Sequence, residues 1–311
     1  MNMDEIYILE DRGFIFVSGE DTKDFLQNII TKDINTVTDN NSSFASIFTP
    51  HVKYLVDFFI IKHNDGYLLD CEKSNVEQLI EIFSNYKLRS KVNFNNESNN
   101  YAAAIISKDK FISLENGKNS LGFTIQYRAN PIFMDPRNEL IGARLISSLE
   151  KLHLSIKKLN LKIANKDDYY NKCYEIGIPE KNLNKLKEKI FGIENNLEEL
   201  NALDFKKGCY VGQENTSRIK LRSKLRRRLL PVKLMKGKIN ENEVIKFQNF
   251  EVGRILIDQP YPFAIVKLTD PNINKFLNEN LQCESGTVKI FLPTSNNSPN
   301  IALVVGQRPA P

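Results

Sequence analysis

The order of apolar segments in the first hundred residues constrains the fold most. Short apolar runs predict strands, and two longer stretches place apolar residues at helical spacing. Strands are expected at residues 13–17, 43–48, 54–62, 66–71 and 91–94, with helices from residue 18 to residue 30 and from residue 74. Strand–helix–strands–helix–strand is a ferredoxin-like order. It predicts an antiparallel sheet with both helices on one face and the other face free to pack on a similar unit.

Both helices are expected to begin at a serine that has an acid three residues later. Ser18 precedes Asp21, and Ser74 precedes Glu77. A serine at such a position accepts a backbone hydrogen bond, and the acid can return one. The pattern therefore predicts capped helix starts at these two serines.

The remainder of the chain predicts a second sheet unit and then a small barrel. The second unit is expected to start with a strand at residues 101–107, continue through a hairpin around Asn116-Gly117, and include a helix over residues 167–174 that ends near Gly177. Short strands divided by turn residues are typical of an antiparallel barrel, and they are expected at residues 229–234, 244–247, 253–257, 263–268 and 287–291, with one helix within residues 271–280. We expect an α+β chain with two ferredoxin-like units, roughly residues 1–100 and 101–228, and a barrel over residues 229–311.

Composition narrows the setting in which such a chain works. Apolar residues make up 41% and charged residues 26%, which is the profile of an ordinary soluble protein. No apolar run approaches the length that spans a bilayer, and the acidic start, with Asp4, Glu5 and Glu10, does not resemble a targeting peptide. We therefore expect a cytoplasmic protein with no membrane partner.

The four cysteines, Cys71, Cys173, Cys209 and Cys283, lie far apart in the sequence. No Cys-x-x-Cys pair and no Cys–His spacing typical of zinc is present. An iron–sulfur cluster held by this chain alone would need thiolates at closer spacing. No metal site is therefore expected, and disulfides are not expected in a reducing compartment.

Residues 206–214, Lys-Lys-Gly-Cys-Tyr-Val-Gly-Gln-Glu, are the most unusual stretch. Gly208 and Gly212 frame Cys209, and glycines permit a sharp turn that brings the backbone close to a ligand. The preceding lysine pair would favour the thiolate form of the cysteine. The alternative is a small buried thiol that fills the turn, and the residues alone favour that alternative.

A basic run follows this stretch, formed by Arg218, Lys220, Arg222, Lys224, Arg226, Arg227 and Arg228. Apolar residues alternate with the cations, as they do on a strand with one solvated face. That explanation and a site for a small anion are equally good, and an RNA backbone comes third. A nucleic-acid partner is therefore not expected.

Residues 207–218, KGCYVGQENTSR, closely resemble the signature of the YgfZ family of folate-binding proteins, which is related in fold to the aminomethyltransferase (T-protein) of the glycine cleavage system. Residues 12–33 resemble that family's opening segment, residues 135–144 its DPR…LG.R element, and residues 174–179 its glutamate–glycine–proline turn. One departure is Cys173, which stands where the family usually has an arginine.

The resemblance implies a tetrahydrofolate-binding accessory protein that supports assembly or repair of iron–sulfur clusters in client enzymes, including tRNA-modifying ones. Its expected partners are folate, the client enzymes and other assembly proteins. Cys209 would be the functional thiol. The folate contacts would be Glu175, Lys207, Gly208, Tyr210, Gly212, Gln213, Glu214 and Arg218. Glu175 and Glu214 would each accept hydrogen bonds from the aminopyrimidine edge, and a solvated carboxylate beside a cation is the alternative for both.

The second hypothesis is a folate-dependent aminomethyl transferase that acts on an unknown amine. The T-protein carries paired aspartates near the strand in which this chain has Val56-Asp57. One carboxylate on a strand is more consistent with a structural role or a ligand contact than with a complete catalytic pair. A non-catalytic protein is therefore the first expectation, with the transferase as the alternative.

Overall fold

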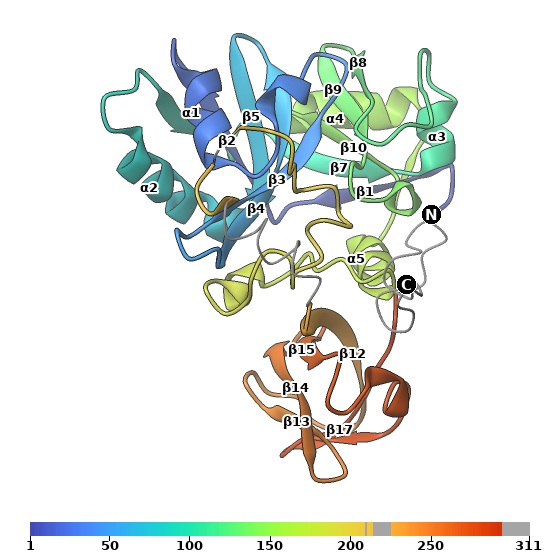
Figure 1. Ribbon diagram of the computed structural model, residues 1–311. Coiled ribbons are helices and arrows are strands. Elements are labelled where there is room, and N and C mark those ends of the chain that lie inside the picture. The colour runs from blue at the N-terminus through green and yellow to red at the C-terminus, as the bar shows by residue number, and fades with distance from the viewer. Residues whose placement is uncertain (209, 214–224, 294–311) are drawn as a thin grey trace, which may run out of the picture.

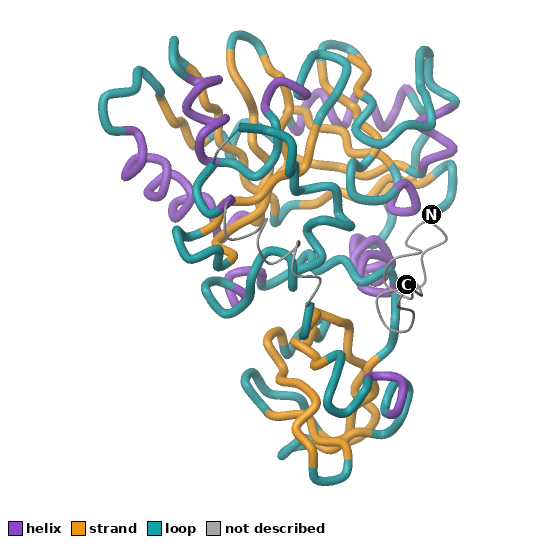
Figure 2. Tube along the Cα trace, viewed as in Figure 1, coloured by secondary structure: helices purple, strands orange, loops and turns teal. Residues whose placement is uncertain are grey.

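The computed structural model describes residues 1–208, 210–213 and 225–293. Two β-sheets stand side by side in the larger part of the molecule, with helices on their outer faces, and a β-barrel lies below them (Figure 1). The described residues between the end of α5 (Lys166–Glu175) and the barrel are mostly loop (Figure 2). Within the described residues, no helix combines the length and apolarity needed to cross a membrane.

The first sheet contains the strands expected in the first hundred residues, in the antiparallel order β3-β4-β5-β2-β6. The strands are β2 (Arg12–Ser18), β3 (Ser43–Phe48), β4 (Tyr54–His63), β5 (Gly66–Glu72) and β6 (Asn93–Asn96), and the helices are α1 (Thr22–Ile29) and α2 (Val76–Lys87). Successive residues of a strand face opposite sides, so Phe58 packs with the helix side and Phe59 with the second sheet. The predicted sheet with helices on one face is confirmed.

The second sheet has the order β11-β1-β7-β10-β9-β8 and is antiparallel except for the β1–β11 pair. Its strands are β1 (Glu5–Leu9), β7 (Ala102–Ile106), β8 (Thr124–Tyr127), β9 (Asn130–Met134), β10 (Ala143–Ser147) and β11 (Lys162–Ile163), with α3 (Lys108–Ile112) and α4 (Leu149–Lys158). Residues 5–9 are not among the predicted strands. Because β1 pairs with β7, the N-terminal segment belongs to the second sheet rather than the first.

The inner faces of the two sheets pack directly on each other. Phe59 of β4 lies at the centre, with its ring centroid 5.1 Å from that of Phe44 and 5.8 Å from that of Phe133 in β9. All three rings are buried. Removing such a ring from a core typically costs about 3–5 kcal/mol, so this contact fixes the position of one sheet on the other.

The predicted serine caps are both wrong. Ser18 is the last residue of β2, where it pairs with Asn93, and α1 begins at Thr22. Ser74 lies in the 3₁₀ helix η2 (Lys73–Asn75), and α2 begins at Val76. Strand pairing and the 3₁₀ turn occupy the two serines, so tertiary context overrides the local capping signal.

The predicted hairpin at Asn116-Gly117 is also wrong. The hairpin of the second sheet joins β8 to β9, with Tyr127 paired to Asn130 and with positive φ at Arg128 (53°) and Ala129 (60°). Asn116 has a positive φ of 65° as well, but it lies in the loop after α3. The Asn-Gly pair thus marks a turn whose flanking segments are not strands.

Further 3₁₀ helices are η1 (Ile34–Thr36), η3 (Glu139–Ile141) and η4 (Leu183–Leu186).

The expected C-terminal barrel is confirmed as a closed sheet in the order β12-β15-β14-β13-β16-β17. Its strands are β12 (Arg227–Gly237), β13 (Val244–Phe247), β14 (Phe250–Ile257), β15 (Phe263–Lys267), β16 (Leu281–Gln282) and β17 (Gly286–Ile290). Within residues 271–280 the helical segment is only the 3₁₀ helix η5 (Ile273–Lys275). The domain division at residue 228 stays a prediction.

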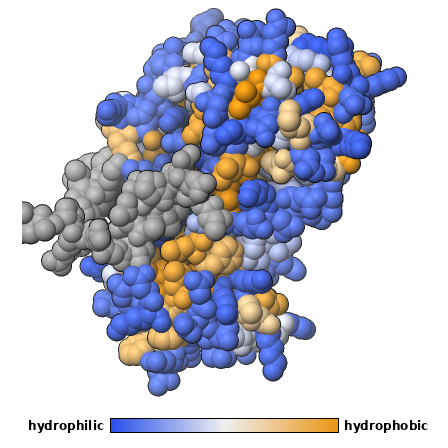
Figure 3. All heavy atoms as spheres, turned by 90° about the vertical axis from the view of Figure 1, so that its right-hand side faces the viewer, coloured by the Kyte–Doolittle hydropathy of each residue, from blue (hydrophilic) through white to orange (hydrophobic). Residues whose placement is uncertain are grey.

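The barrel and the sheets meet through apolar side chains. Phe263 of β15 packs edge-on against Tyr174 of α5, with ring centroids 5.7 Å apart. Phe263 belongs to the core that also fills the space between the sheets, and the partly buried Tyr174 packs against that core. Hydrophobic residues gather at this waist on the face shown in Figure 3. The α+β architecture of the whole chain is as the sequence predicts.

Candidate functional site

The turn that carries the signature motif is anchored by Lys207. Its ammonium donates to the backbone carbonyls of Gln27 (2.7 Å), Ile30 (2.7 Å) and Lys32 (3.0 Å), at the C-terminal end of α1. These carbonyls have no partner within the helix, and a cation is favoured there. Burial lowers the pKa of Lys207 to about 8, against the opposing effect of Asp33 and Asp204. All three donors of this ammonium are used within the protein, so a folate contact by Lys207 would require one of these bonds to be exchanged.

Gln213 closes the turn from the other side. Its amide oxygen accepts from the backbone N–H of Tyr210 (3.2 Å), and its amide nitrogen donates to the carbonyl of Lys207 (3.0 Å). Gly212 has a φ of 87°, and a Cβ there would come within 3.3 Å of the Thr49 carbonyl at the end of the β3–β4 hairpin. The second glycine of the motif is thus required by backbone conformation and by a close approach.

The surroundings change between the two sides of Cys209. Tyr210 is buried in the core between the sheets, whereas Gly208 is exposed, and no described atom lies within 4 Å of the position that a Gly208 Cβ would occupy. Cys209, Glu214 and Arg218 lie outside the described residues. Their expected roles, and those of Gly208 and Tyr210 as folate contacts, stay predictions.

A network of buried charges lies between the two sheets, next to Phe59. Arg12 of β2 donates to Asp70 of β5 (2.6 Å), and Arg144 of β10 donates to the same carboxylate (2.9 Å) and to the Tyr169 hydroxyl (3.0 Å). Asp70 and Arg144 have no exposed surface. One carboxylate therefore ties strands of both sheets together.

The DPR segment supplies the other half of this network. Arg137 donates to both oxygens of Asp135 (3.0 and 2.8 Å) and is ion-paired with Glu180, which also lies 3.5 Å from Arg12. Burial would raise the pKa of Glu180, but the guanidinium groups of Arg137, Arg12 and Arg144 outweigh burial and hold this pKa below its ordinary value. Three guanidinium groups thus balance the carboxylates of Asp70, Asp135 and Glu180.

Asp57 is a further buried acid, and it is not among the carboxylates that balance the three guanidinium groups. It lies on β4, two residues before Phe59, and only 6% of it is exposed. Burial raises its pKa to about 7, although Arg137 and Arg12 oppose the rise. The buried Tyr54 hydroxyl lies beside the Asp57 carboxyl and interacts with it, outside standard hydrogen-bond geometry. Asp57 and Tyr54 are therefore polar groups with hydrogen-bonding capacity to spare.

Glu175 and Cys173 lie on different faces of α5. Glu175 is exposed at the helix end, 4.0 Å from the ammonium of Lys172, whereas the carboxylate buried nearby in the sequence is Glu180. The Cys173 side chain is fully buried, and burial raises the pKa of its thiol well above the ordinary value. The role of Glu175 as a folate contact stays a prediction, and Cys173 is a packed, protonated thiol.

The described end of the basic run makes ion pairs within the protein. Arg227 donates to both oxygens of Glu194 (2.9 and 3.3 Å), and Arg228 is ion-paired with Glu199. These pairs join β12 to the loop that precedes the motif. Both arginines are thus bound within the protein, but Arg228 is buried, so the solvated strand face that the alternation predicts does not describe it.

Sequence reasoning did not single out Asp70, Tyr169 or Glu180. A signal was present for Asp70, because it interrupts the apolar run Leu68-Leu69-Asp70-Cys71 of a strand buried on both faces. A charge in such a strand must be paired with another buried charge. Its partners lie 58 and 74 residues away, beyond what one sequence can assign. Among the described residues, no group of three or more His, Cys, Asp or Glu side chains could hold a metal ion.

No family model matches this chain. The chain is 30% identical over 227 residues to the tRNA-modifying protein YgfZ of Buchnera aphidicola, and the match covers 69% of each chain. It is also 31% identical to the mitochondrial iron-sulfur cluster assembly factor IBA57 homolog of Pyricularia oryzae and 27% identical to that of Dictyostelium discoideum. Each of these matches covers 72% of this chain, but only 56% and 61% of the respective relative. The chain therefore spans little more than half the length of these two relatives.

Among solved structures, the glycine cleavage system aminomethyltransferase T from Bartonella henselae superimposes with a TM-score of 0.70, over 92% of this chain and 84% of that one. The sequence identity is only 10%, so this likeness shows the fold alone. The predicted T-protein-like arrangement of two sheet units and a barrel is confirmed.

Proposed function

The chain belongs to the YgfZ family, and on that premise we propose that it is a tetrahydrofolate-binding accessory factor that supports iron–sulfur clusters in client enzymes through the thiol of Cys209. The names of the relatives support this role, since they describe a tRNA-modifying protein and iron–sulfur cluster assembly factors. Client enzymes and other assembly proteins are the proposed partners.

The anchoring of the motif turn carries the proposal. Lys207 and Gln213 hold the turn from both sides, while Gly208 remains exposed with open space beside it. In the proposal, the thiol of Cys209, next in the chain to this anchored turn, acts as a transient ligand for iron.

Asp57 and Tyr54 are the groups that fit a folate. A pterin presents ring nitrogens and an amino group along one edge, and a carboxyl group can both donate to such an edge and accept from it when its pKa is near 7. The Tyr54 hydroxyl beside Asp57 would accept a further hydrogen bond from the pterin amino group. The pterin itself would supply a redox-active or one-carbon-carrying ring. In the proposal, Asp57 and Tyr54 bind and orient it.

The thiol role is tested by complementation of cells that lack their own copy of this protein. We expect Cys209→Ala to lose most of the rescue of iron–sulfur enzyme activity, because the ligand atom is removed. Cys283→Ala is the matched control, since that thiol lies half-buried in the barrel. Full rescue by Cys209→Ala, with both variants expressed equally, would remove the thiol from the mechanism.

The folate role is tested by titration of the purified protein with tetrahydrofolate. We expect Asp57→Asn to weaken binding by roughly tenfold or more, since a buried hydrogen bond to a ligand is typically worth 1–3 kcal/mol. Glu175→Ala tests the exposed carboxylate in the same assay. A loss confined to Glu175→Ala would move the site to the end of α5, and the absence of any binding would remove folate from the proposal.

The compartment is part of the same proposal. The sequence alone suggests the cytoplasm, but several relatives are named as mitochondrial. We propose that the protein works where its source cell assembles iron–sulfur clusters, which for a cell with mitochondria is the mitochondrion. Fractionation of cells that express the tagged full-length protein would decide between the two compartments.

A further inference from the structure

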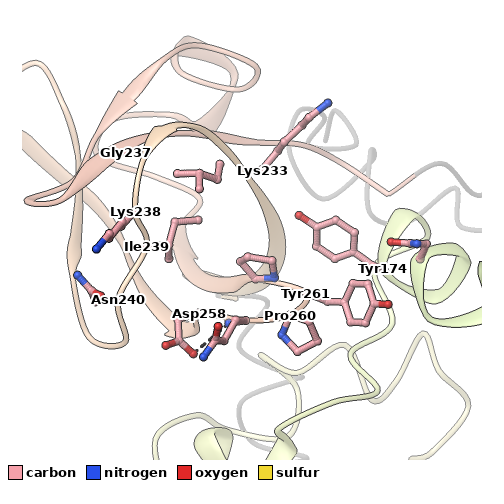
Figure 4. A pocket seen from close by; sticks show the side chains of 13 residues that line it. Tyr174, Lys233, Gly237, Lys238, Ile239, Asn240, Asp258, Pro260 and Tyr261 are labelled. Carbon is pink, nitrogen blue, oxygen red and sulfur yellow. Dashed lines mark hydrogen bonds between the residues drawn. The ribbon is translucent and has the colours of Figure 1, made fainter. Parts of the chain in front are cut away.

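A pocket of about 590 Å³ lies between α5 and the barrel (Figure 4). Tyr174 and Tyr261 form its wall on the α5 side, with ring centroids 5.8 Å apart, and Lys238 and Asn240 lie on the barrel side. None of these residues belongs to the motif turn or to the buried charge network. The proposed function therefore leaves this pocket unused.

One strand edge opens into the pocket. β12 pairs with β15 only as far as Pro231, and from Val232 to Gly237 it pairs only with β17, with a register shift between Leu234 and Lys236. On the open side, the Val232 N–H donates to the Pro262 carbonyl (2.9 Å), and the Val232 carbonyl accepts from the Tyr174 hydroxyl. Backbone groups alternate sides along a strand, so the next N–H and C=O on this side belong to Leu234. No described residue pairs with them.

Positive charge without a partner surrounds this edge. Lys233 stands directly opposite Lys289 of β17, and like charges in that arrangement repel each other. Within the described part of the chain, neither of them, nor Lys236 or Lys238, forms an ion pair. The acid in the pocket lining, Asp258, is already bound by Lys185. Lysines on a free edge discourage pairing with a second copy of the chain, and the same charges attract a strand that carries carboxylates.

We propose that this edge is a docking site for an extended acidic peptide segment of a partner protein, which adds to β12 as an antiparallel or parallel strand between Lys233 and Gly237. Backbone bonds to Leu234 would supply affinity, and the lysines would select carboxylate side chains. An apolar side chain of the segment would pack on Tyr174 and Tyr261. A nucleic acid or a free phosphate fits less well, because neither offers a backbone N–H for the Leu234 carbonyl.

The probe is a fluorescently labelled hexapeptide that alternates glutamate and valine, and binding is followed by fluorescence anisotropy. The same peptide with lysine in place of glutamate is the charge control. We expect the glutamate peptide to bind, the lysine peptide not to bind, and salt to weaken the interaction. In the peptide complex, hydrogen exchange of the Leu234 amide should slow.

Two pairs of variants separate charge from strand addition. Lys233→Glu with Lys238→Glu should weaken binding by roughly tenfold or more, whereas Lys246→Glu, an exposed lysine of β13, should not. Leu234→Pro removes the pocket-side N–H at an edge position where proline is tolerated, and Leu234→Ala keeps it. Only the proline variant should lose roughly tenfold in affinity. A thermal melt checks that each variant is folded.

Three results would overturn the proposal. The first is no binding of the glutamate peptide, or equal binding of both peptides. The second is equal affinity of Leu234→Pro and Leu234→Ala without slowed exchange at Leu234, which would mean that side-chain charge alone attracts the peptide. The third is displacement of the peptide by a single-stranded oligonucleotide or by inorganic phosphate at lower concentration than by unlabelled peptide, which would assign the edge to a phosphate ligand.

Discussion

Basic side chains lie in opposite surroundings in the centre of the sheet sandwich and at the edge of the barrel. Between the sheets, Arg12, Arg137 and Arg144 are buried, and each is paired with at least one buried carboxylate. At the β12 edge, Lys233 and Lys238 are exposed, and neither forms an ion pair with a described residue. A buried charge must be paired for the chain to fold, whereas an exposed one can remain open for a partner.

The difference also separates structural groups from candidate functional groups inside the core. Asp57 shares the inter-sheet space with the arginines, yet the three guanidinium groups are already matched by other carboxylates. Lys207, which the motif suggests as a ligand contact, donates all three of its hydrogen bonds to backbone carbonyls at the C-terminal end of α1. Hydrogen-bonding capacity that the fold has not used is thus a better guide to function here than charge alone.

The largest expected effect is on the buried network. Arg144→Met should lower the free energy of unfolding by about 3–5 kcal/mol, because it leaves the fully buried Asp70 carboxylate with one cation fewer. Urea unfolding measures the change. Arg254→Met is the matched control, since that guanidinium is exposed and lies 3.9 Å from Glu251, and its loss should stay within about 0.5 kcal/mol. Equal losses in the two variants would remove the distinction between the paired interior and the exposed surface.

Asp57→Asn should have the next largest effect, and its size should depend on pH. The folded-state pKa of about 7 lies above the ordinary value of 3.8, so the native state keeps a proton that the unfolded chain loses between these values. The stability that this group contributes therefore falls as pH rises from about 4 to about 7. Compared with the wild type, Asp57→Asn should gain about 2–4 kcal/mol between pH 4 and pH 8 in urea unfolding. A pH-independent difference would show that Asp57 is ionised like a surface acid.

Lys207→Met should destabilise the protein by about 1–3 kcal/mol, because it leaves three backbone carbonyls at the end of α1 without their donor. Lys206→Met is the control, because Lys206 is exposed. Hydrogen exchange of α1 in both variants measures the effect. If α1 exchanges equally in the two, Lys207 is not the anchor of the turn.

Lys233→Gln should have the smallest effect on folding. Loss of its charge relieves the repulsion from Lys289, so the free energy of unfolding should rise by at most about 0.5 kcal/mol. Thermal unfolding at low salt measures the change, and added salt should abolish it. A clear destabilisation would mean that Lys233 has a structural partner, and the contrast with the buried arginines would then fail.

The sequence predicts the repeated sheet units and the barrel because alternation and turn residues are local signals. It also points to the motif turn, since the two glycines and the polar residues between them are adjacent in the chain. The predicted helix starts and the predicted hairpin are wrong because tertiary structure overrides the local signals. Ser18 is held in a paired strand, Ser74 lies in a 3₁₀ helix, and Asn116 lies in the loop after α3. The free edge of β12 has no signal at all, because it exists only where β15 ends.

The sequence by itself determined the α+β architecture and the family, and it singled out Cys209 as the candidate thiol, since these depend on patterns of neighbouring residues. Only the tertiary structure decided which charges are free. Three strands in two sheets bring together Arg12, Asp70 and Arg144. These groups pair with one another, and Asp57 is not part of that pairing. Whether a charged group is a structural partner or an open site depends on groups many residues away, and folding alone brings those groups into contact.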